Sequence, residues 1–169
     1  GKIKSIFSGI EKPVNPTERY YVQIPDNKEP IIAMAKDKEQ QYVQAYIMLK
    51  HDDIPDEVKN TLNYYITLYA NQVAERMASQ RLAELRELPE PPFIRAAIGD
   101  DDYFFAKTKG SFLGYVVGNE AGFNTAITTL YREMLRIMRH GFTASEYERA
   151  KAEYLASIES AYNQRAKIT

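Results

Sequence analysis

The sequence predicts an α+β fold in which helices pack on one face of a mostly antiparallel sheet. Three observations support this prediction. Apolar segments rich in β-formers come in pairs, one pair before a long helical segment and one before two further helices. The helical segments carry apolar residues at three- and four-residue spacing, as helices with one buried face do. The eight glycines form neither a G-x-G-x-x-G fingerprint nor a P-loop, which argues against a doubly wound nucleotide-binding fold.

Length and composition are those of an ordinary globular chain. The 169 residues correspond to one domain, with room for a piece of another. With 22 basic and 23 acidic residues, the net charge of −1 gives no electrostatic reason to expect nucleic acid or an anionic membrane as partner. No apolar run approaches the roughly 18 residues that span a bilayer, so no membrane span is expected. The absence of cysteine excludes disulfides, thiolate nucleophiles and cysteine-ligated metals.

The N-terminal part of the chain is predicted to be a short helix and a linker. Residues 1–12 read as the last turns of a helix, because four large apolar side chains recur at helical spacing: Ile3, Ile6, Phe7 and Ile10. Residues 13–30 hold four of the eight prolines and are expected to be extended, with at most a short strand at 20–24. This stretch is either an N-terminal arm or the connector that follows the final helix of a preceding domain.

The first strand pair and the long helix follow. Residues 31–35 (IIAMA) predict a buried strand and residues 42–49 (YVQAYIML) a second one, with the polar segment DKEQQ between them. Asp56 or one of its neighbours is expected to cap a helix over 57–88, and a break near Ser79 fits its unusual length. The expected buried stripe of this helix comprises Val58, Leu62, Ile66, Tyr69, Val73, Met77, Leu82, Leu85 and Leu88.

The second half is predicted to hold three strand-like segments and two helices. A proline cluster ends the long helix, and strands are expected at 93–98, 103–106 and 111–118. Gly141 stops the next helix, and Thr143 with Glu146 forms a capping box for the last one. The predicted buried faces of these two helices are Phe123, Ile127, Leu130, Met134 and Ile137, then Tyr147, Ala150, Tyr154, Ile158 and Tyr162. With the three strand-like segments counted as one hairpin-like strand pair, the predicted order is strand, strand, helix, strand, strand, helix, helix.

The histidines do not predict a metal site. Successive residues of an extended chain point in opposite directions, so His51, Asp52 and Asp53 are expected to form a solvated turn and not to share one ion. His140 precedes Gly141 and is expected to end a helix, where the helix dipole favours a cation. The two histidines are far apart in the sequence, and neither has the spacing of a zinc-binding helix.

The remaining candidates for chemistry have simpler interpretations. The acidic residues 100–102 are expected to form a hairpin loop and not an ion site. Ser111 follows Gly110, but the surrounding residues miss the G-x-S-x-G pattern of a nucleophile elbow. Arg81 and Glu84 are expected on a solvated face of the long helix. Packing is the expected role of most of the thirteen tyrosines, among them Tyr65, Tyr69 and Tyr154.

Four stretches together resemble the insulinase-like (pitrilysin-type, inverzincin) zinc metallopeptidases. Residues 3–13 (IKSIFSGIEKP) resemble the end of the catalytic domain of those enzymes, and TERYYVQIPDNKEPIIAMAKDKE resembles the connector to the next domain. RLAELRELPEPPFIRAAIG, residues 81–99, looks like the helix–strand junction of that next domain. GFTASEYERAKAEYL, residues 141–155, is similar to the G-[FL]-T-x-x-E-x-x-x-x-K motif of its closing helices.

The resemblance implies a domain that does not itself cut. The zinc signature H-x-x-E-H does not occur in this sequence, so no catalytic or metal-binding residue is carried over, and substrate-binding residues stay unassigned. Residues 1–12 would be the tail helix of the preceding domain, 13–30 the linker, and 31–169 a non-catalytic domain. No cofactor is expected in this chain. Zinc is expected in the catalytic domain of the parent protein, which for a bacterial parent would work in the periplasm or cell envelope.

The function implied is part of a zinc-dependent metalloendopeptidase. The domain would form part of the peptide-substrate chamber and support the catalytic domain. Its partners would be the other domains of the same polypeptide and, in the full-length protein, a peptide substrate. Two alternatives stay open: an inactive scaffold homologue of the same family, and an unrelated α+β protein-binding module with an exposed apolar groove.

Overall fold

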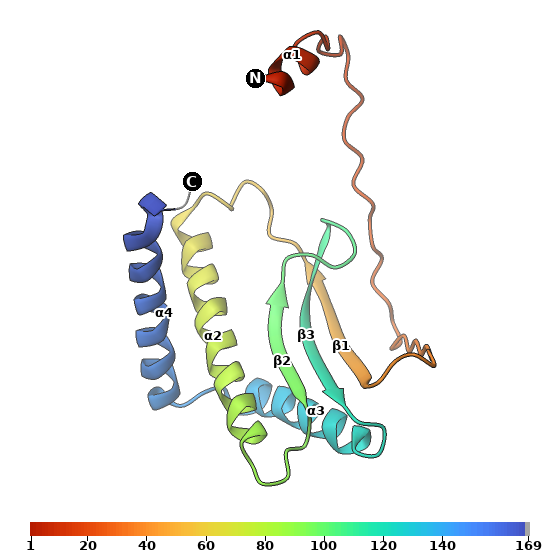
Figure 1. Cartoon of the computed structure of the whole chain (residues 1–169), viewed down its shortest axis with the longest axis vertical. Helices are drawn as coiled ribbons and strands as arrows, with labels where there is room; N and C mark the ends of the chain where they lie inside the picture. The colour runs from red at the N-terminus through yellow and green to blue at the C-terminus, as the bar shows by residue number, and fades with distance from the viewer. Residues whose placement is uncertain (168–169) are drawn as a thin grey trace.

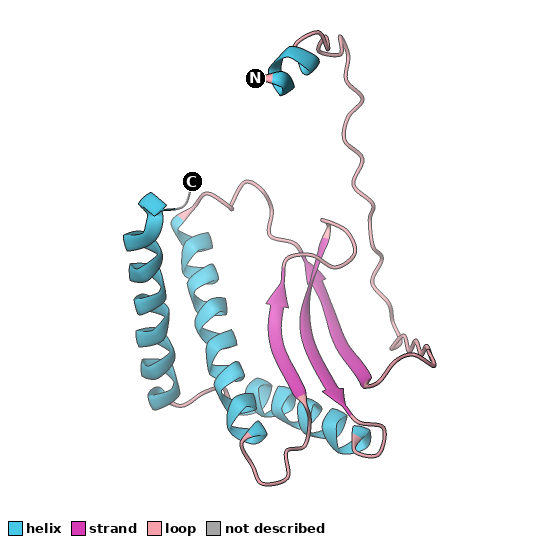
Figure 2. Cartoon of the chain, viewed as in Figure 1, coloured by secondary structure: helices cyan, strands magenta, loops and turns pink. Residues whose placement is uncertain are grey.

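The computed structural model describes residues 1–167 and has the α+β class that the sequence predicts (Figures 1 and 2). Three strands form one antiparallel sheet in the order β1-β3-β2. The strands are β1 (Val43–Asp52), β2 (Arg95–Asp101) and β3 (Lys109–Gly118). The helices of the described residues are α1 (Lys2–Phe7), α2 (Leu62–Arg86), α3 (Phe123–His140) and α4 (Ala144–Gln164), with a 3-10 turn at Arg165–Lys167.

The central strand β3 sets the register of the sheet. Val116 lies opposite Ala45 of β1 and Ala96 of β2, and Gly114 lies between Ile47 and Ile98 in the next row. Because side chains alternate along a strand, these rows share one face of the sheet. Members of both rows contact the hydrophobic core together with residues of α2 and α3. Helices α2 and α3 therefore cover this face, while α4 packs against α2 (Figure 1).

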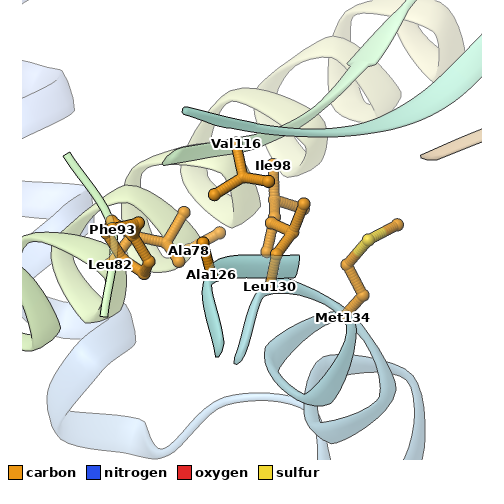
Figure 3. Packing of buried hydrophobic residues seen from close by; sticks show 8 residues of the cluster. All are labelled: Ala78, Leu82, Phe93, Ile98, Val116, Ala126, Leu130 and Met134. Atoms are coloured by element: carbon orange, nitrogen blue, oxygen red, sulfur yellow. The ribbon is translucent and has the colours of Figure 1, made fainter. Parts of the chain in front are cut away.

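The main core lies between the sheet and the two helices that cover it. Leu130 of α3 and Val116 of β3 are fully buried, and Figure 3 shows these side chains between the ribbons of the sheet and α3. The residues of this cluster are Ala78, Leu82, Phe93, Ile98, Val116, Ala126, Leu130 and Met134. All five positions of α3 that the sequence placed on its buried face are buried or partly buried in this cluster.

Helix α2 differs from the prediction at both ends and in the middle. It begins after Thr61, whose hydroxyl oxygen accepts a hydrogen bond from the Tyr64 amide at 3.3 Å, and not at Asp56. Asp56 instead forms an ion pair with Lys59 at 3.0 Å. The helix runs without a break through Ser79 and ends at Arg86. Its length is retained because consecutive turns pack first on α4 and then on the sheet.

The buried stripe of α2 occupies only its second half. Val73, Met77 and Leu82 are buried, as predicted, whereas Leu62 and Ile66 are exposed. Helix α4 runs beside α2 (Figure 1), but the apolar side chains of these first turns stay in solvent. Helix α4 shows the same pattern. Ala150 is fully buried against α2 and Tyr154 is partly buried, but its other predicted apolar positions, Tyr147, Ile158 and Tyr162, are exposed.

The junction between α3 and α4 is built as predicted. Gly141 ends α3 with a φ of 62°, a backbone conformation that favours glycine. Thr143 is the N-cap of α4, and its hydroxyl accepts from the Glu146 amide at 3.3 Å. The Glu146 carboxylate in turn accepts from the Thr143 amide at 2.7 Å. Both halves of the capping box are therefore present.

Three strand predictions are corrected. Residues 31–35 form no strand, and their apolar side chains are exposed, Met34 by 93%. The segment at 103–106 contains only a single bridge between Phe104 and Ala106, around Phe105 with a φ of 56°. Asp100 and Asp101 belong to β2 and not to a loop, because the β2–β3 pairing continues to Ser111. The order of elements in the described residues is helix, strand, helix, strand, strand, helix, helix.

Candidate functional site

The consecutive side chains of His51, Asp52 and Asp53 bind three different partners. The His51 imidazole lies 3.0 Å from the Asp100 carboxylate. Asp52 pairs with Lys109 of β3 at 2.6 Å, and Asp53 pairs with Lys59 at 3.0 Å. His51 and Asp52 are the last residues of β1, so they form the end of a strand and not the predicted turn. The three side chains therefore point to different places, as expected for adjacent residues of an extended chain.

The contact between His51 and Asp100 crosses the central strand. His51 of β1 lies opposite Gly110 of β3. Asp100 of β2, on the other side of β3, lies opposite Phe112. A Cβ atom at Gly110 would come within 2.6 Å of the Asp101 carbonyl oxygen and still closer to the His51 ring. Only glycine therefore leaves the space through which the imidazole reaches Asp100.

Helix α2 adds two polar side chains to this contact. The Asn71 amide nitrogen lies 3.4 Å from the second carboxylate oxygen of Asp100. Glu75 accepts a hydrogen bond from the Asp100 backbone amide at 2.9 Å. We call His51, Asn71, Glu75 and Asp100 the His51 cluster. Its members come from three elements that are distant in the sequence, so no local sequence motif predicts the cluster.

Hydrogen bonds determine the charge state of His51. Nδ1 lies 2.9 Å from the Asp52 carbonyl oxygen, and Nε2 lies 3.0 Å from the Asp100 carboxylate. Both partners are acceptors, so the ring satisfies both contacts only when it is protonated. The pKa of His51 is raised above 6.5, chiefly by the bond to the Asp52 carbonyl and further by the negative charge of Asp100, against the opposing effect of partial burial.

A groove of about 280 Å³ adjoins the cluster. Its rim is polar and includes Asn71, Glu75 and Asp100. Its walls are apolar and come from α2, the sheet, the end of α3 and the loop that follows: Ala74, Ala78, Ile98, Phe112, Ile137 and Phe142. An apolar group with a hydrogen-bond donor at one end matches this lining, because the two rim carboxylates are acceptors. Serine, threonine, lysine and cysteine are absent from the described residues that line the groove.

A second charged network lies where α2 meets the α3–α4 junction. The guanidinium of Arg81 donates to the Glu146 carboxylate at 2.9 Å and to the Gly141 carbonyl at 2.9 Å. It also lies 4.6 Å from the centre of the Phe142 ring. Arg81 is buried, so its predicted place on a solvated face is wrong. The bond from Arg81 is the main reason that the pKa of Glu146 is lowered to about 2.

The other residues that the sequence analysis considered for a chemical role lie apart from the His51 cluster. His140 is exposed at the last position of α3, as predicted. Ser111 is buried within β3. Tyr69 and Tyr154 pack edge to face with ring centres 5.6 Å apart, which fits the predicted packing role, but Tyr65 is exposed.

In residues 1–167 no three or more His, Asp or Glu side chains are arranged to hold a metal ion. None of the helices in that range combines the length and the apolar character needed to cross a membrane.

Comparisons of the chain with protein-family models, with curated proteins and with solved structures find no match.

Proposed function

We propose that this chain is a non-catalytic domain of a zinc-dependent metalloendopeptidase of the insulinase-like family. In this proposal residues 1–12 are the tail helix of a preceding domain, 13–30 are the linker, and 31–169 are the supporting domain. The domain forms part of the wall of the chamber that holds the peptide substrate. Zinc belongs to the catalytic domain, and no residue of this chain is given a catalytic or metal-binding role.

The observation that carries the proposal is an apolar surface near the N-terminus that the described chain does not cover. Ile3, Ile6, Phe7 and Ile10 are all exposed, Ile3 by 78%. They lie on or beside α1, which stands apart from the rest of the molecule (Figure 1). A helix of six residues is far too short to be stable alone, so α1 needs packing to exist. The missing contacts are those that a preceding domain would supply.

The linker is attached to the body at a defined place. Thr108 donates a hydrogen bond to the Val22 carbonyl at 2.7 Å, and the Lys50 ammonium donates to the Pro25 carbonyl at 2.6 Å. Lys109 forms an ion pair with Asp26 at 2.9 Å. These contacts hold residues 22–26 against the ends of β1 and β3. A linker held in this way leaves the body of the domain from a defined point, which fits a supporting role beside a preceding domain.

The face of the sheet opposite the helices also favours a place inside a larger protein. Tyr46 and Tyr115 pack on it with ring centres 4.7 Å apart, and Tyr46 and Met48 are exposed there. Exposed aromatic and apolar side chains of this kind are typical of a surface that contacts another part of a protein or a ligand. In the proposal it faces a neighbouring domain or the chamber.

The groove beside the His51 cluster favours a second candidate, an α+β protein-binding module unrelated to peptidases. Such a module was expected to show an exposed apolar groove, and the lining described above fits an apolar side chain of a partner protein. It would fold and bind as an isolated chain. The inactive scaffold homologue, in contrast, has the same structure as the peptidase domain and differs only in the zinc signature of its preceding domain.

Hydrolysis of a quenched fluorescent, unfolded peptide tests the proposal, with and without a zinc chelator. This chain alone is expected to show no turnover. A longer protein that includes the preceding domain is expected to show chelator-sensitive turnover. Chelator-sensitive turnover by this chain alone would overturn the proposal, and no turnover in either would favour the inactive scaffold.

A surface variant tests the role of α1 in the longer protein. Ile6→Asp places a charge in the exposed apolar surface and is expected to lower the hydrolysis rate, because it weakens the packing of α1 on the preceding domain. Lys4→Ala, on the same helix, is the matched control and should leave the rate unchanged. Equal rates for Ile6→Asp and the unaltered protein would contradict the proposed interface.

A further inference from the structure

One edge of the sheet is formed by β1, and no described strand pairs with its outer side. The strand order places β1 and β2 at the two edges. At the β2 edge, Glu75 of α2 accepts from the backbone amide of Asp100. β1 is ten residues long and pairs only with β3 among the described strands. A long uncovered edge strand presents unpaired amide and carbonyl groups that can bind another strand.

The chain that enters β1 turns back along this edge. The Gln40 amide donates to the Asp37 carbonyl at 3.3 Å, which closes a turn with Lys38 and Glu39 at its tip. The Asp37 carboxylate also accepts from the Glu39 amide at 2.9 Å, a side-chain contact that stabilises such turns. In Figure 1 the preceding segment descends on the β1 side of the sheet before this turn. Neither Lys38 nor Glu39 has a positive φ, so this is a type I turn, around which hairpin loops of four residues are most often built.

The turn defines a register for the segment. Counting outward from the Asp37–Gln40 pair, Ala33 falls opposite Gln44 and Ile31 falls opposite Tyr46. In the same register Asp26 falls opposite His51, the next-to-last residue of β1.

The far end of the segment is already held near that register. The Lys109 ammonium bridges Asp26, at 2.9 Å, and Asp52, at 2.6 Å. Asp26 therefore lies beside the final residue of β1, one position from its expected partner His51. Lys50 also binds the Pro25 carbonyl at 2.6 Å. The turn before β1 and the contacts at its other end thus agree on one antiparallel alignment to within one or two positions.

The side-chain pattern of the segment fits the same register. Ile32 falls opposite Ala45 and Met34 opposite Val43. Directly opposed residues share a face of the sheet, and Ala45 contacts the core beneath the helices. Pairing would move Ile32 and Met34, which are 83% and 93% exposed, onto the covered face. Pro30 would stand at the start of an edge strand, where proline is tolerated.

We propose that the free edge of β1 is a strand-docking surface and that its occupant is residues 31–35 of this same chain. The segment closes on β1 as a fourth strand, next to β1 in the order segment, β1, β3, β2. This inference goes beyond the proposed function and does not depend on it. A closed edge leaves no place there for an added peptide strand or for the edge of a second copy.

Cysteine pairs test the register, because the chain has no cysteine of its own. Ala33→Cys with Gln44→Cys places two thiols directly opposite, within the Cα separation that a disulfide bridges. Ala33→Cys with Tyr46→Cys is the matched control, displaced by two residues along β1. The opposed pair is expected to oxidise within one chain about tenfold faster than the control, since diagonal neighbours are roughly 2 Å farther apart. Mass spectrometry and a non-reducing gel measure both rates.

The same experiment can overturn the proposal in two ways. Equal rates for the two pairs mean that the segment stays off the edge. Disulfide-linked dimers that dominate at micromolar concentration mean that the edge takes a second copy.

A pair of charge substitutions provides a second test without cysteine. Ile32→Asp is expected to lower the midpoint of thermal unfolding by roughly 3 °C, because docking would bury this side chain. Ile31→Asp is the matched control, since Ile31 would face the open side of the sheet beside Tyr46. Circular dichroism at low temperature confirms that both variants fold. Equal midpoints in the two variants contradict a docked strand in the stated register.

Discussion

The imidazole of His51 reaches the carboxylate of Asp100 across the intervening strand β3, with 3.0 Å between Nε2 and Oδ1. Gly110 of β3 lies opposite His51 in the register, whereas Asp100 lies opposite Phe112, and a side chain at Gly110 would fill the path between them. This glycine thereby leaves room for a charged contact between the two edge strands of the sheet. Asn71 and Glu75 then tie this contact to α2.

Gly110→Ala is expected to destabilise the protein by about 1–3 kcal/mol, because the added methyl group overlaps the His51 ring and the Asp101 carbonyl oxygen. The central strand cannot move away without breaking pairs on both sides. Urea unfolding followed by circular dichroism measures the change. Gly122→Ala, where a Cβ meets nothing within 4 Å, is the control and should cost clearly less.

The contribution of His51 to stability is expected to decline as the pH rises. Its pKa is raised in the folded state, so its contribution is fully present below the unfolded value of 6.5 and is lost as the pH rises through the folded pKa. His51→Gln should therefore lower the free energy of unfolding more at about pH 5.5 than at about pH 8.5. The effect should stay below about 1 kcal/mol because the side chain is partly exposed.

A double-mutant cycle identifies the partner of His51. In an Asp100→Asn background, the pH dependence of the His51→Gln effect should shrink, because the charge that favours the imidazolium is gone. Asp102 also raises the pKa of His51, so a residual dependence is expected. An unchanged pH dependence in that background would show that Asp100 is not the relevant charge.

Arg81→Ala is expected to destabilise the protein by about 3–5 kcal/mol, since it leaves Glu146 and the Gly141 carbonyl without their buried donor. Arg149→Ala is the matched control. Arg149 is half exposed and pairs with Glu84 at 3.4 Å, so its loss should cost less than about 1 kcal/mol. Chemical unfolding of both variants measures the difference, and similar losses would contradict a buried role for Arg81.

Acid should remove the contribution of Glu146 to the stability of the folded protein. Its pKa is lowered from 4.5 to about 2, so its contribution is fully present above 4.5 and is lost as the pH falls through about 2. The stability difference between the unaltered protein and Glu146→Gln should therefore be smaller near pH 3 than near pH 7. Glu148→Gln is the control, because the exposed Glu148 only approaches Lys151 at 3.8 Å, and its effect should change less with pH.

Local chemistry made several elements predictable. The Thr143–Glu146 capping box, the Gly141 stop and the buried face of α3 all depend on residues within a few positions of one another. Residues 42–49 and 111–118 were predicted as strands and correspond to β1 and β3. The class of the fold followed from these elements, because strand pairs and amphipathic helices must bury their apolar sides against each other.

Predictions failed where the outcome depended on a partner. Residues 31–35 have the composition of a strand, yet in the described structure they do not pair with the neighbouring edge of β1 and so form none. Arg81 was placed in solvent because its neighbours on α2 are charged, but its partners come from α4 and the loop before it. The first turns of α2 carry an apolar stripe that no part of the described chain covers.

By itself the sequence determined the local signals: the caps, the glycine and proline stops, and the periodicity of the helices and of most strands. Tertiary structure alone decided which of these surfaces are buried and which distant side chains meet. His51 and Asp100 meet because both pair across β3, and Arg81 and Glu146 meet because α2 packs on α4. Such contacts depend on strand register and helix packing, which arise from the whole chain and leave no pattern in a short stretch of sequence.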